Sequence, residues 1–427
     1  MTHDSARPGA PLPVTPPFEA LSAITHVRPW GGQPVTLHLA DGVISAITPM
    51  TDDDTPAASQ RPASQHPASE GRTLDGRDLL ALPGIVNAHA HVDKSWWGLP
   101  WQSYGGEGGT QGRIAHERAR RDELGIPGLD ITTRVLAEMV RHGTTAFRSH
   151  VDVDLGLGLS GLDIVRDAAA RFESAIELHT VAFPQDGILR RDGVADLLRR
   201  AAHTGRTEHI GGLDPASIDR DPVGQIDLIC DIAADTGVGI DIHLHDPAEL
   251  GAFQIELLCE RAERYGLIGR ITIAHGFALA QLDSGRRTEL LARMGEAGMS
   301  MTTVAPLRLP QLPKDELRAA GVRLALGTDG IRDLWSPYGT GDTLGIAWQF
   351  ARASSLVTDD DLLDVVRLAT TDAAWALGRP LPDDMGFGPG CRADIVLIDA
   401  MNPLDALVRT LPREAVIGAG RLLYSRT

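Results

Sequence analysis

The chain has 427 residues, of which 43% are hydrophobic, and a formal net charge of −17. Such a chain can bury a large core and has room for more than one domain, while its negative charge argues against nucleic acid or an anionic membrane as a partner. The three cysteines are too few and too scattered for a disulfide framework, and no apolar run reaches the ~18 residues of a membrane span. We therefore expect a cytoplasmic protein.

Both ends of the chain lie outside the main pattern. Residues 1–17 are polar and proline-rich, which predicts a disordered tail rather than a signal peptide. Residues 18–50 and 387–424 alternate apolar and polar positions between turns, a pattern typical of hairpins. Each part is too short to bury a core alone, so we prefer one small β-sandwich, formed by residues 18–82 plus 384–427, to two unrelated appendages. Residues 51–72 are rich in Asp, Pro, Ala, Ser and Gln, and predict a disordered or loosely packed excursion.

His89 and His91 follow the apolar run Leu79–Val86, which is typical of a buried strand. Because side chains alternate along a strand, both imidazoles point to the same face. Two neutral imidazoles that converge on one point suit a divalent transition metal. A pair of ordinary core or surface histidines is the alternative for such a motif taken alone.

Seven further apolar segments are each closed by polar residues or a turn. They cover residues 144–152, 175–183 and 209–213, and then the segments that end at His245, His275, Pro306 and Asp329. Helical candidates lie between them, for example residues 129–142 and 254–265. Eight alternations of strand and helix predict a (β/α)8 barrel over residues 83–383, with its chemistry at the carboxyl ends of the strands. A catalytic metal site keeps three or four protein ligands, and His89, His91, one of His243 or His245, and Asp329 would supply them.

Several longer motifs accompany these histidines and carry a family resemblance. They are His89–Asp93, Ser149–Val153, Val181–Leu189, Asp241–Asp246, His275, and Gly327–Asp329 followed by Asp333–Thr340. With these motifs the chain resembles the amidohydrolase superfamily, and within it the cytosine deaminase branch. The run from Ala90 to Ser95 is also similar to the N-isopropylammelide amidohydrolases.

The resemblance implies that His89, His91, His243 and Asp329 hold one divalent metal ion, zinc or iron(II). Binuclear relatives use a lysine after the fourth strand, whereas this chain has only Lys94 and Lys314, so a mononuclear site is expected. Asp329 would accept a proton from the water that the metal activates, and His275 would orient that water or polarise the substrate.

The expected general acid is Asp246, which takes the position of a glutamate in cytosine deaminases, with Glu249 as the alternative. Both could instead orient ligands or cap a helix. For the substrate, we expect Gln185 to pair with the ring edge, Trp335 to stack on the ring, and Lys94 to favour an anionic or carbonyl-bearing ring. Alternatively, Gln185 faces water, Trp335 packs in the barrel mouth, and Lys94 forms a salt bridge to Asp93 or another carboxylate.

Gly330 departs from the resemblance, because cytosine deaminases have an acidic residue there. We expect the glycine to remove a charge and open space for a larger ring. The sequence thus predicts a hydrolytic deaminase of an amino-substituted nitrogen heterocycle, expected to be a homo-oligomer. One alternative is an amidohydrolase that releases an alkylamine from a triazine-like or amide substrate, and a remote one is a non-catalytic assembly protein.

Overall fold

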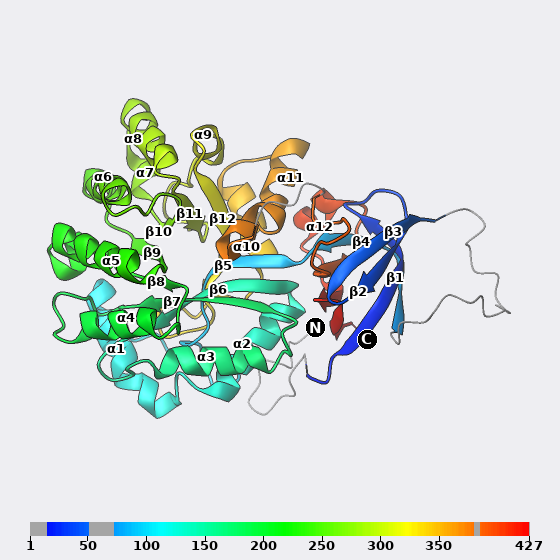
Figure 1. The fold of residues 1–427 in the computed structure, drawn as a ribbon, viewed down its shortest axis with the longest axis horizontal. Coiled ribbons are helices and arrows are strands. Elements are labelled where there is room, and N and C mark those ends of the chain that lie inside the picture. Colours follow the sequence, from blue (N-terminus) through cyan, green and yellow to red (C-terminus); the bar gives the residue numbers. More distant parts are fainter. Residues whose placement is uncertain (1–14, 51–71, 380–384, 427) are drawn as a thin grey trace.

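The computed structural model describes residues 15–50, 72–379 and 385–426. The predicted N-terminal tail and the predicted excursion after residue 50 therefore lie almost wholly outside the described residues. Two sheets and the helices around them make up the described part (Figure 1). No helix in that part is long and apolar enough to cross a membrane.

The larger sheet is parallel, in the order β12-β11-β10-β9-β8-β7-β6-β5-β13. Only Gly327 and Thr328 separate β12 from β13, so these two form one strand position, and β13 pairs with β5 at the opposite edge. The sheet thus returns to its start, which confirms the expected α/β barrel. Its strands are β5 (Ile85–His91), β6 (Thr144–Asp152), β7 (Glu177–Phe183), β8 (His209–Ile210), β9 (Gly239–Leu244), β10 (Ile271–His275), β11 (Ser300–Thr303), β12 (Arg323–Leu326) and β13 (Asp329–Gly330).

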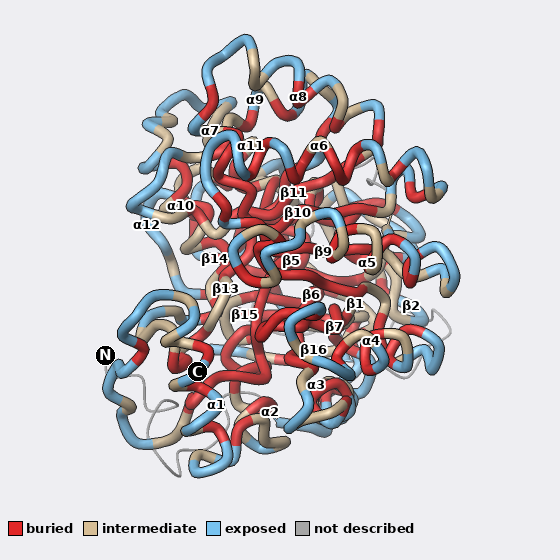
Figure 2. The backbone as a smooth tube through the Cα atoms, turned by 90° about the vertical axis from the view of Figure 1, so that its left-hand side faces the viewer, coloured by how far each residue is buried: buried red, intermediate tan, exposed pale blue. Residues whose placement is uncertain are grey.

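Helices alternate with these strands and cover the outside of the barrel, so the strands are buried and the outer helical turns are exposed (Figure 2). The expected helix over residues 129–142 is α2, whereas the one expected from residue 254 begins earlier, as α6. The helices are α1 (Gly109–Leu124), α2 (Leu129–Arg141), α3 (Ser160–Ala170), α4 (Val194–His203), η3 (Pro215–Asp219), α5 (Pro222–Thr236), α6 (Ala248–Arg264), α7 (Ala278–Gln281), α8 (Ser284–Glu296), α9 (Lys314–Ala319), α10 (Thr343–Ala353), α11 (Asp359–Arg367), η4 (Thr371–Leu377) and α12 (Pro403–Arg409).

The smaller sheet combines segments from both ends of the chain, as expected. Its order is β16-β15-β14-β4-β1-β2-β3, and β16 also pairs with β1. Its strands are β1 (Glu19–Pro29), β2 (Val35–Ala40), β3 (Val43–Pro49), β4 (Arg72–Pro83), β14 (Ile395–Ile398), β15 (Arg413–Gly418) and β16 (Arg421–Ser425). They enclose a separate apolar core that includes Ile24, Leu37, Ile44, Ile395 and Ile417.

This sheet closes on itself, which corrects the expected sandwich of two facing sheets. β1 pairs with β16 at Glu19 and Ala20, and with β2 from Ala23 to Val27. Along this strand the register with β2 and β4 shifts, and His26 has a φ of 52°. Such irregularities bend a strand and increase its twist, so one sheet can curl around the core that two sheets would otherwise enclose.

The apolar run Leu79–Val86 crosses from one sheet to the other at Gly84. β4 ends at Pro83 in the small sheet, and β5 begins at Ile85 in the barrel. A Cβ atom on Gly84 would lie 2.0 Å from the Thr145 Oγ1 atom and 2.8 Å from the Asp394 Cβ atom. Only glycine fits this close approach, and the crossing delivers His89 and His91 directly to the carboxyl end of β5.

Candidate active site

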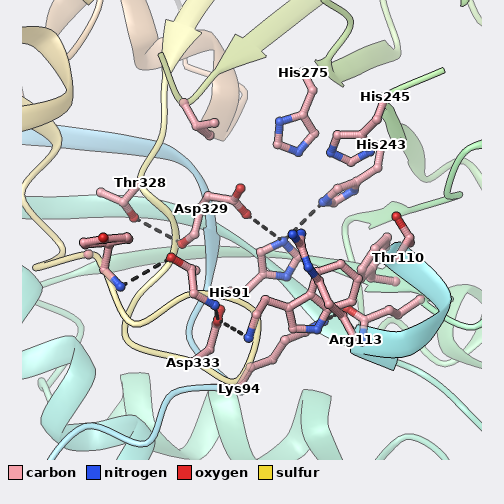
Figure 3. Close-up of a pocket in the computed structure, with 18 of the residues that line it drawn as sticks. His91, Lys94, Thr110, Arg113, His243, His245, His275, Thr328, Asp329 and Asp333 are labelled. Atoms are coloured by element: carbon pink, nitrogen blue, oxygen red, sulfur yellow. Dashed lines mark hydrogen bonds and ion pairs between the residues drawn. The ribbon is translucent and has the colours of Figure 1, made fainter. Parts of the chain in front are cut away.

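The carboxyl ends of the barrel strands bring four histidines and one aspartate together. Figure 3 shows His91, His243 and His275 with Asp329 at the cavity. β5 carries His89 and His91, β9 carries His243, β10 ends at His275, and β13 begins at Asp329. The Asp329 Oδ1 atom lies 3.3 Å from His91 Nε2 and 3.6 Å from His89 Nε2. His91 Nε2 and His243 Nε2 are 3.2 Å apart. The pairing of β13 with β5 places Asp329 opposite Ala90, between the two histidines of the motif.

The ring nitrogens of this cluster suit a metal ion. Burial lowers the pKa of His91 to about 4 and also keeps the pKa of His243 and His275 well below the usual value, so these rings are neutral at pH 7. Both ring nitrogens of His89, and the Nδ1 atoms of His91 and His243, have no hydrogen-bond partner among the described residues. A buried polar atom without a partner is costly, whereas neutral imidazoles beside a carboxylate are the donor set that zinc or iron(II) prefers.

The potential ligand atoms form overlapping groups. One group holds His89, His243 and His275, and another holds His89, His91 and Asp329, with the ligand atoms of each group within 4.8 Å of one another. Burial alone would raise the pKa of Asp329, but its contacts with His89 and His91 outweigh burial and keep this pKa well below the usual value. Asp329 is therefore an anion at the cluster, which is the form of a carboxyl group that binds a metal ion.

A third group, formed by His89, His150 and Asp241, lies deeper in the barrel. The Arg148 Nη1 atom lies 2.7 Å from Asp241 Oδ2, so a buried guanidinium already compensates this carboxylate. A cation there would have to compete with Arg148, which favours the other two groups as the metal site.

A cavity of about 480 Å³ opens beside the cluster. Such a volume lies within the range of small-molecule sites. Its lining includes His91, His243, His275 and Asp329 together with three residues expected to bind substrate, Lys94, Gln185 and Trp335.

Lys94 is buried in this wall and is surrounded by partners. Its Nζ atom lies 2.8 Å from Asp152 Oδ1 and 3.9 Å from Glu117 Oε1, and it donates to Gln185 Oε1. Burial alone would lower the pKa of Lys94, but Asp152 and Glu117 outweigh burial and raise it, so the amine is charged. The sequence left two alternatives for Lys94, a place in the substrate cavity or a salt bridge to a carboxylate. In the structure Lys94 lines the cavity and also forms the salt bridge.

Glu117 joins the residues of this wall to one another. Its Oε2 atom accepts from Gln185 Nε2 at 2.9 Å and from Trp335 Nε1. The side-chain amide of Gln185 therefore uses its oxygen on Lys94 and one N–H on Glu117. The sequence did not single out Glu117, because it lies on α1 within an ordinary charged helical segment and follows no strand end.

His245 faces the cavity on the other side of the cluster. Its Nδ1 atom lies 3.1 Å from Asp214 Oδ2, and its ring stacks on that of His275 with the centroids 4.2 Å apart. Burial alone would lower the pKa of His245, but the hydrogen bond to Asp214 outweighs it and the pKa is raised. The sequence did not single out Asp214 either. It follows β8, so the pattern of a polar residue at the end of a strand could have identified it.

The two expected candidates for the general acid, Asp246 and Glu249, are not among the residues that line the cavity. Asp246 is buried, accepts from Ser217 Oγ, and also accepts from Gln254 Nε2 at 2.9 Å. Glu249 is on the exposed first turn of α6, with its Oε2 atom 3.5 Å from Arg286 Nε. The contacts of Asp246 connect η3 to α6.

The space beside Gly330 is filled, which corrects the expectation of an opening there. A Cβ atom on Gly330 would lie 1.9 Å from the Asp333 Oδ2 atom. The side chain of Asp333 therefore occupies the volume that the glycine leaves, and it lines the cavity. The loop after β13 folds back onto Gly330, a return that the sequence does not indicate.

Comparisons with known proteins identify the family and the fold. A model of the amidohydrolase family matches residues 128–424. The uncharacterized protein YahJ of Escherichia coli (strain K12) is 32% identical over 357 residues, which are 81% of this chain and 75% of YahJ. The crystal structure of N-isopropylammelide isopropylaminohydrolase from Burkholderia multivorans is 34% identical, with a TM-score of 0.85, over 95% of this chain and 98% of that chain. For 5-methylcytosine deaminase from Klebsiella pneumoniae the identity is 24% and the TM-score 0.78 over the same shares, a likeness that shows the fold.

Proposed function

Because this chain belongs to the amidohydrolase family, and its relatives include an N-isopropylammelide isopropyl amidohydrolase and a pterin deaminase, we propose that it hydrolyses the exocyclic C–N bond of an amino-substituted nitrogen heterocycle. The observation that carries this proposal is one cavity with a histidine–carboxylate cluster at one side and a hydrogen-bonding, aromatic wall at the other. Such a site can hold a flat polar ring with one face toward the cluster, from which a water molecule can attack it.

We assign His89, His91, His243 and Asp329 as the ligands of one divalent ion, zinc or iron(II). Their unpartnered ring nitrogens and the carboxylate between them support this assignment. An ion held there supplies a nucleophile near neutral pH, because it lowers the pKa of water.

The residues around the cluster would move the protons. Asp329 is an anion at the cluster and can accept the proton of the attacking water through Oδ1. His275 lies beside it with a neutral ring that can orient that water. His245, which Asp214 holds at Nδ1, is the cavity-facing group placed to pass a proton from Nε2 to the departing amine. We therefore propose His245 for the role expected of Asp246, since Asp246 is engaged by Ser217 and Gln254.

The opposite wall would bind the ring. Trp335 offers a flat face that Glu117 holds through the indole N–H. Lys94 and the free N–H of Gln185 can donate to ring carbonyl oxygens or ring nitrogens. Donors predominate on this wall, so we propose a ring that carries at least one carbonyl group.

A substrate screen tests the proposal. Metal-loaded protein is incubated with cytosine, pterin, ammelide and N-isopropylammelide, and ammonia and isopropylamine are measured separately. Release of either amine from a ring supports the proposal, provided that Asp329→Asn abolishes it. Protein that binds close to one metal ion per chain and releases no amine from any ring would contradict it.

A second candidate is release of an alkylamine rather than ammonia. It is favoured by the higher identity to N-isopropylammelide isopropylaminohydrolase, 34% against 24% for 5-methylcytosine deaminase. Both reactions use the same attack and differ in the group that leaves. The ratio of isopropylamine release from N-isopropylammelide to ammonia release from ammelide therefore decides between them.

We also propose that the protein is cytoplasmic and forms a homo-oligomer. An exposed apolar groove between α10, α11 and α12, lined by Trp348, Leu356, Val357 and Val408, supports association. Light scattering of wild type and of Val357→Glu tests the oligomeric state separately. If the groove joins subunits, the charged side chain should dissociate them, and the measured molar mass should fall.

A further inference from the structure

Asp333 is a buried carboxyl group in the cavity wall with its two oxygens in different situations. Oδ1 accepts from the backbone N–H groups of Trp335 and Ser336, both at 2.8 Å. Oδ2 has no hydrogen bond to any residue in the described ranges, and it fills the space above Gly330, next to the ligand Asp329. The side chain is therefore fixed by one oxygen and presents the other beside the metal cluster.

The charges around Asp333 determine its protonation. Burial and then the negative charge of Glu117, with a smaller effect of Asp329, raise its pKa to about 7, against the opposing effects of the hydrogen bond from the Ser336 backbone N–H and of Lys94. Near neutral pH a large share of the protein thus carries a proton on this carboxyl. Since Oδ1 is an acceptor in two hydrogen bonds, the proton resides on Oδ2, where it can be donated.

Building on the proposed function, we propose that Asp333 determines substrate specificity: its Oδ2–H group donates a hydrogen bond to a carbonyl oxygen or ring nitrogen of the bound heterocycle. The alternative is that Asp333 only holds the loop that carries Trp335. The two roles differ in a measurable way, because a donated proton is lost as the pH rises and a loop contact at Oδ1 is not.

Asp333→Asn separates these roles. The amide keeps the acceptor at Oδ1 and provides a donor at every pH, while Lys94, Glu117 and Asp329 are unchanged. Binding of uracil and hypoxanthine, carbonyl-bearing rings of two sizes, is measured by calorimetry on metal-loaded protein. For wild type we expect the affinity to fall about tenfold from pH 6 to pH 8. The reason is that the protonated fraction of a group with a pKa of about 7 falls by about the same factor over this range. For Asp333→Asn we expect affinity that stays within about twofold over this range.

Gly330→Ala provides a second test that does not depend on pH. Gly330 lacks the positive φ that would make alanine strained, so the added methyl group acts through Asp333. We expect it to weaken ring binding about tenfold in wild type and less than twofold in an Asp333→Ala background, with metal content equal in all four proteins. Binding of neither ring to wild type would overturn this inference, whereas the amine-release screen decides the proposed function separately. Ring binding with the same pH dependence in wild type and Asp333→Asn, or an equal effect of Gly330→Ala in both backgrounds, would overturn this inference alone.

Discussion

Glu117→Gln should loosen the substrate wall without touching the metal cluster. The Glu117 Oε2 atom accepts from Gln185 Nε2 at 2.9 Å and from Trp335 Nε1, while Oε1 lies 3.9 Å from Lys94 Nζ. Glutamine has nearly the same shape, and its oxygen can keep both hydrogen bonds. These bonds lose the ionic character that makes a carboxylate acceptor about twice as strong, and the new NH2 group faces the ammonium of Lys94.

The expected loss is about 1 to 3 kcal/mol in the positioning of the wall. If the wall binds the ring before and during attack, as proposed, the loss should raise KM about tenfold and lower kcat by less. The assay is steady-state kinetics on the best substrate of the screen, with metal content measured on the same samples. A KM within twofold of wild type would refute the positioning role of Glu117.

Glu138→Gln is the matched control for this variant. Glu138 is a buried glutamate on α2 that contacts Arg141 and His142 and does not line the cavity. Its substitution should lower the free energy of unfolding and leave KM unchanged. If both variants raise KM equally, the effect of Glu117 reflects general loss of stability.

Three further outcomes are expected. Asp329→Asn should reduce kcat more than tenfold while three imidazoles retain part of the metal; activity above about a tenth of wild type, a loss under about 1.4 kcal/mol, would exclude its double role. His245→Asn should cost on the order of 10²-fold in kcat, and Asp246→Asn should mainly lower the melting temperature; the reverse order would return the role of acid to Asp246. Hydrogen bonds from His142 and Arg141 outweigh burial and lower the pKa of Glu138 from 4.5 to about 2, so its ionised form adds about 3 kcal/mol of stability above pH ~4.5 that is lost as the pH falls toward 2. The difference in unfolding free energy between wild type and Glu138→Gln should accordingly shrink on acidification below pH ~4.5, and a constant difference would show that this pKa is not lowered.

The barrel and its histidine–aspartate cluster were predictable from the sequence. Each strand is a short apolar run, and each candidate ligand stands at the carboxyl end of such a run. Parallel strands end at the same edge of a barrel, so residues as distant as His89 and Asp329 were expected to meet. Local pattern and topology together were sufficient for this part.

Other features depend on contacts that no local pattern records. The alternation in residues 18–50 indicates strands, but the shifts of register in β1 decide that the sheet closes instead of forming a sandwich. Glu117 lies on a helix, where a charged residue is usually exposed, and it supports the cavity residues Gln185 and Trp335 from behind. The loop after Asp329 returns over Gly330, so a missing side chain at one position is replaced by Asp333 three residues later.

Lys94 shows why the surroundings of a charge matter more than the charge itself. A lone cation beside a metal would favour an anionic ring, which was one of the two possibilities expected from the sequence. Here Asp152 and Glu117 lie within 2.8 and 3.9 Å of the amine, and burial raises the pKa of Asp93 to about 6 and that of Asp152 well above its usual value. Glu117 and the ionised share of these two carboxyl groups balance the charge of Lys94, so an anionic ring would gain little from the lysine and would approach further carboxyl groups. A neutral ring that offers carbonyl oxygens to Lys94 and Gln185 loses nothing by this arrangement, which is why we propose this class of substrate.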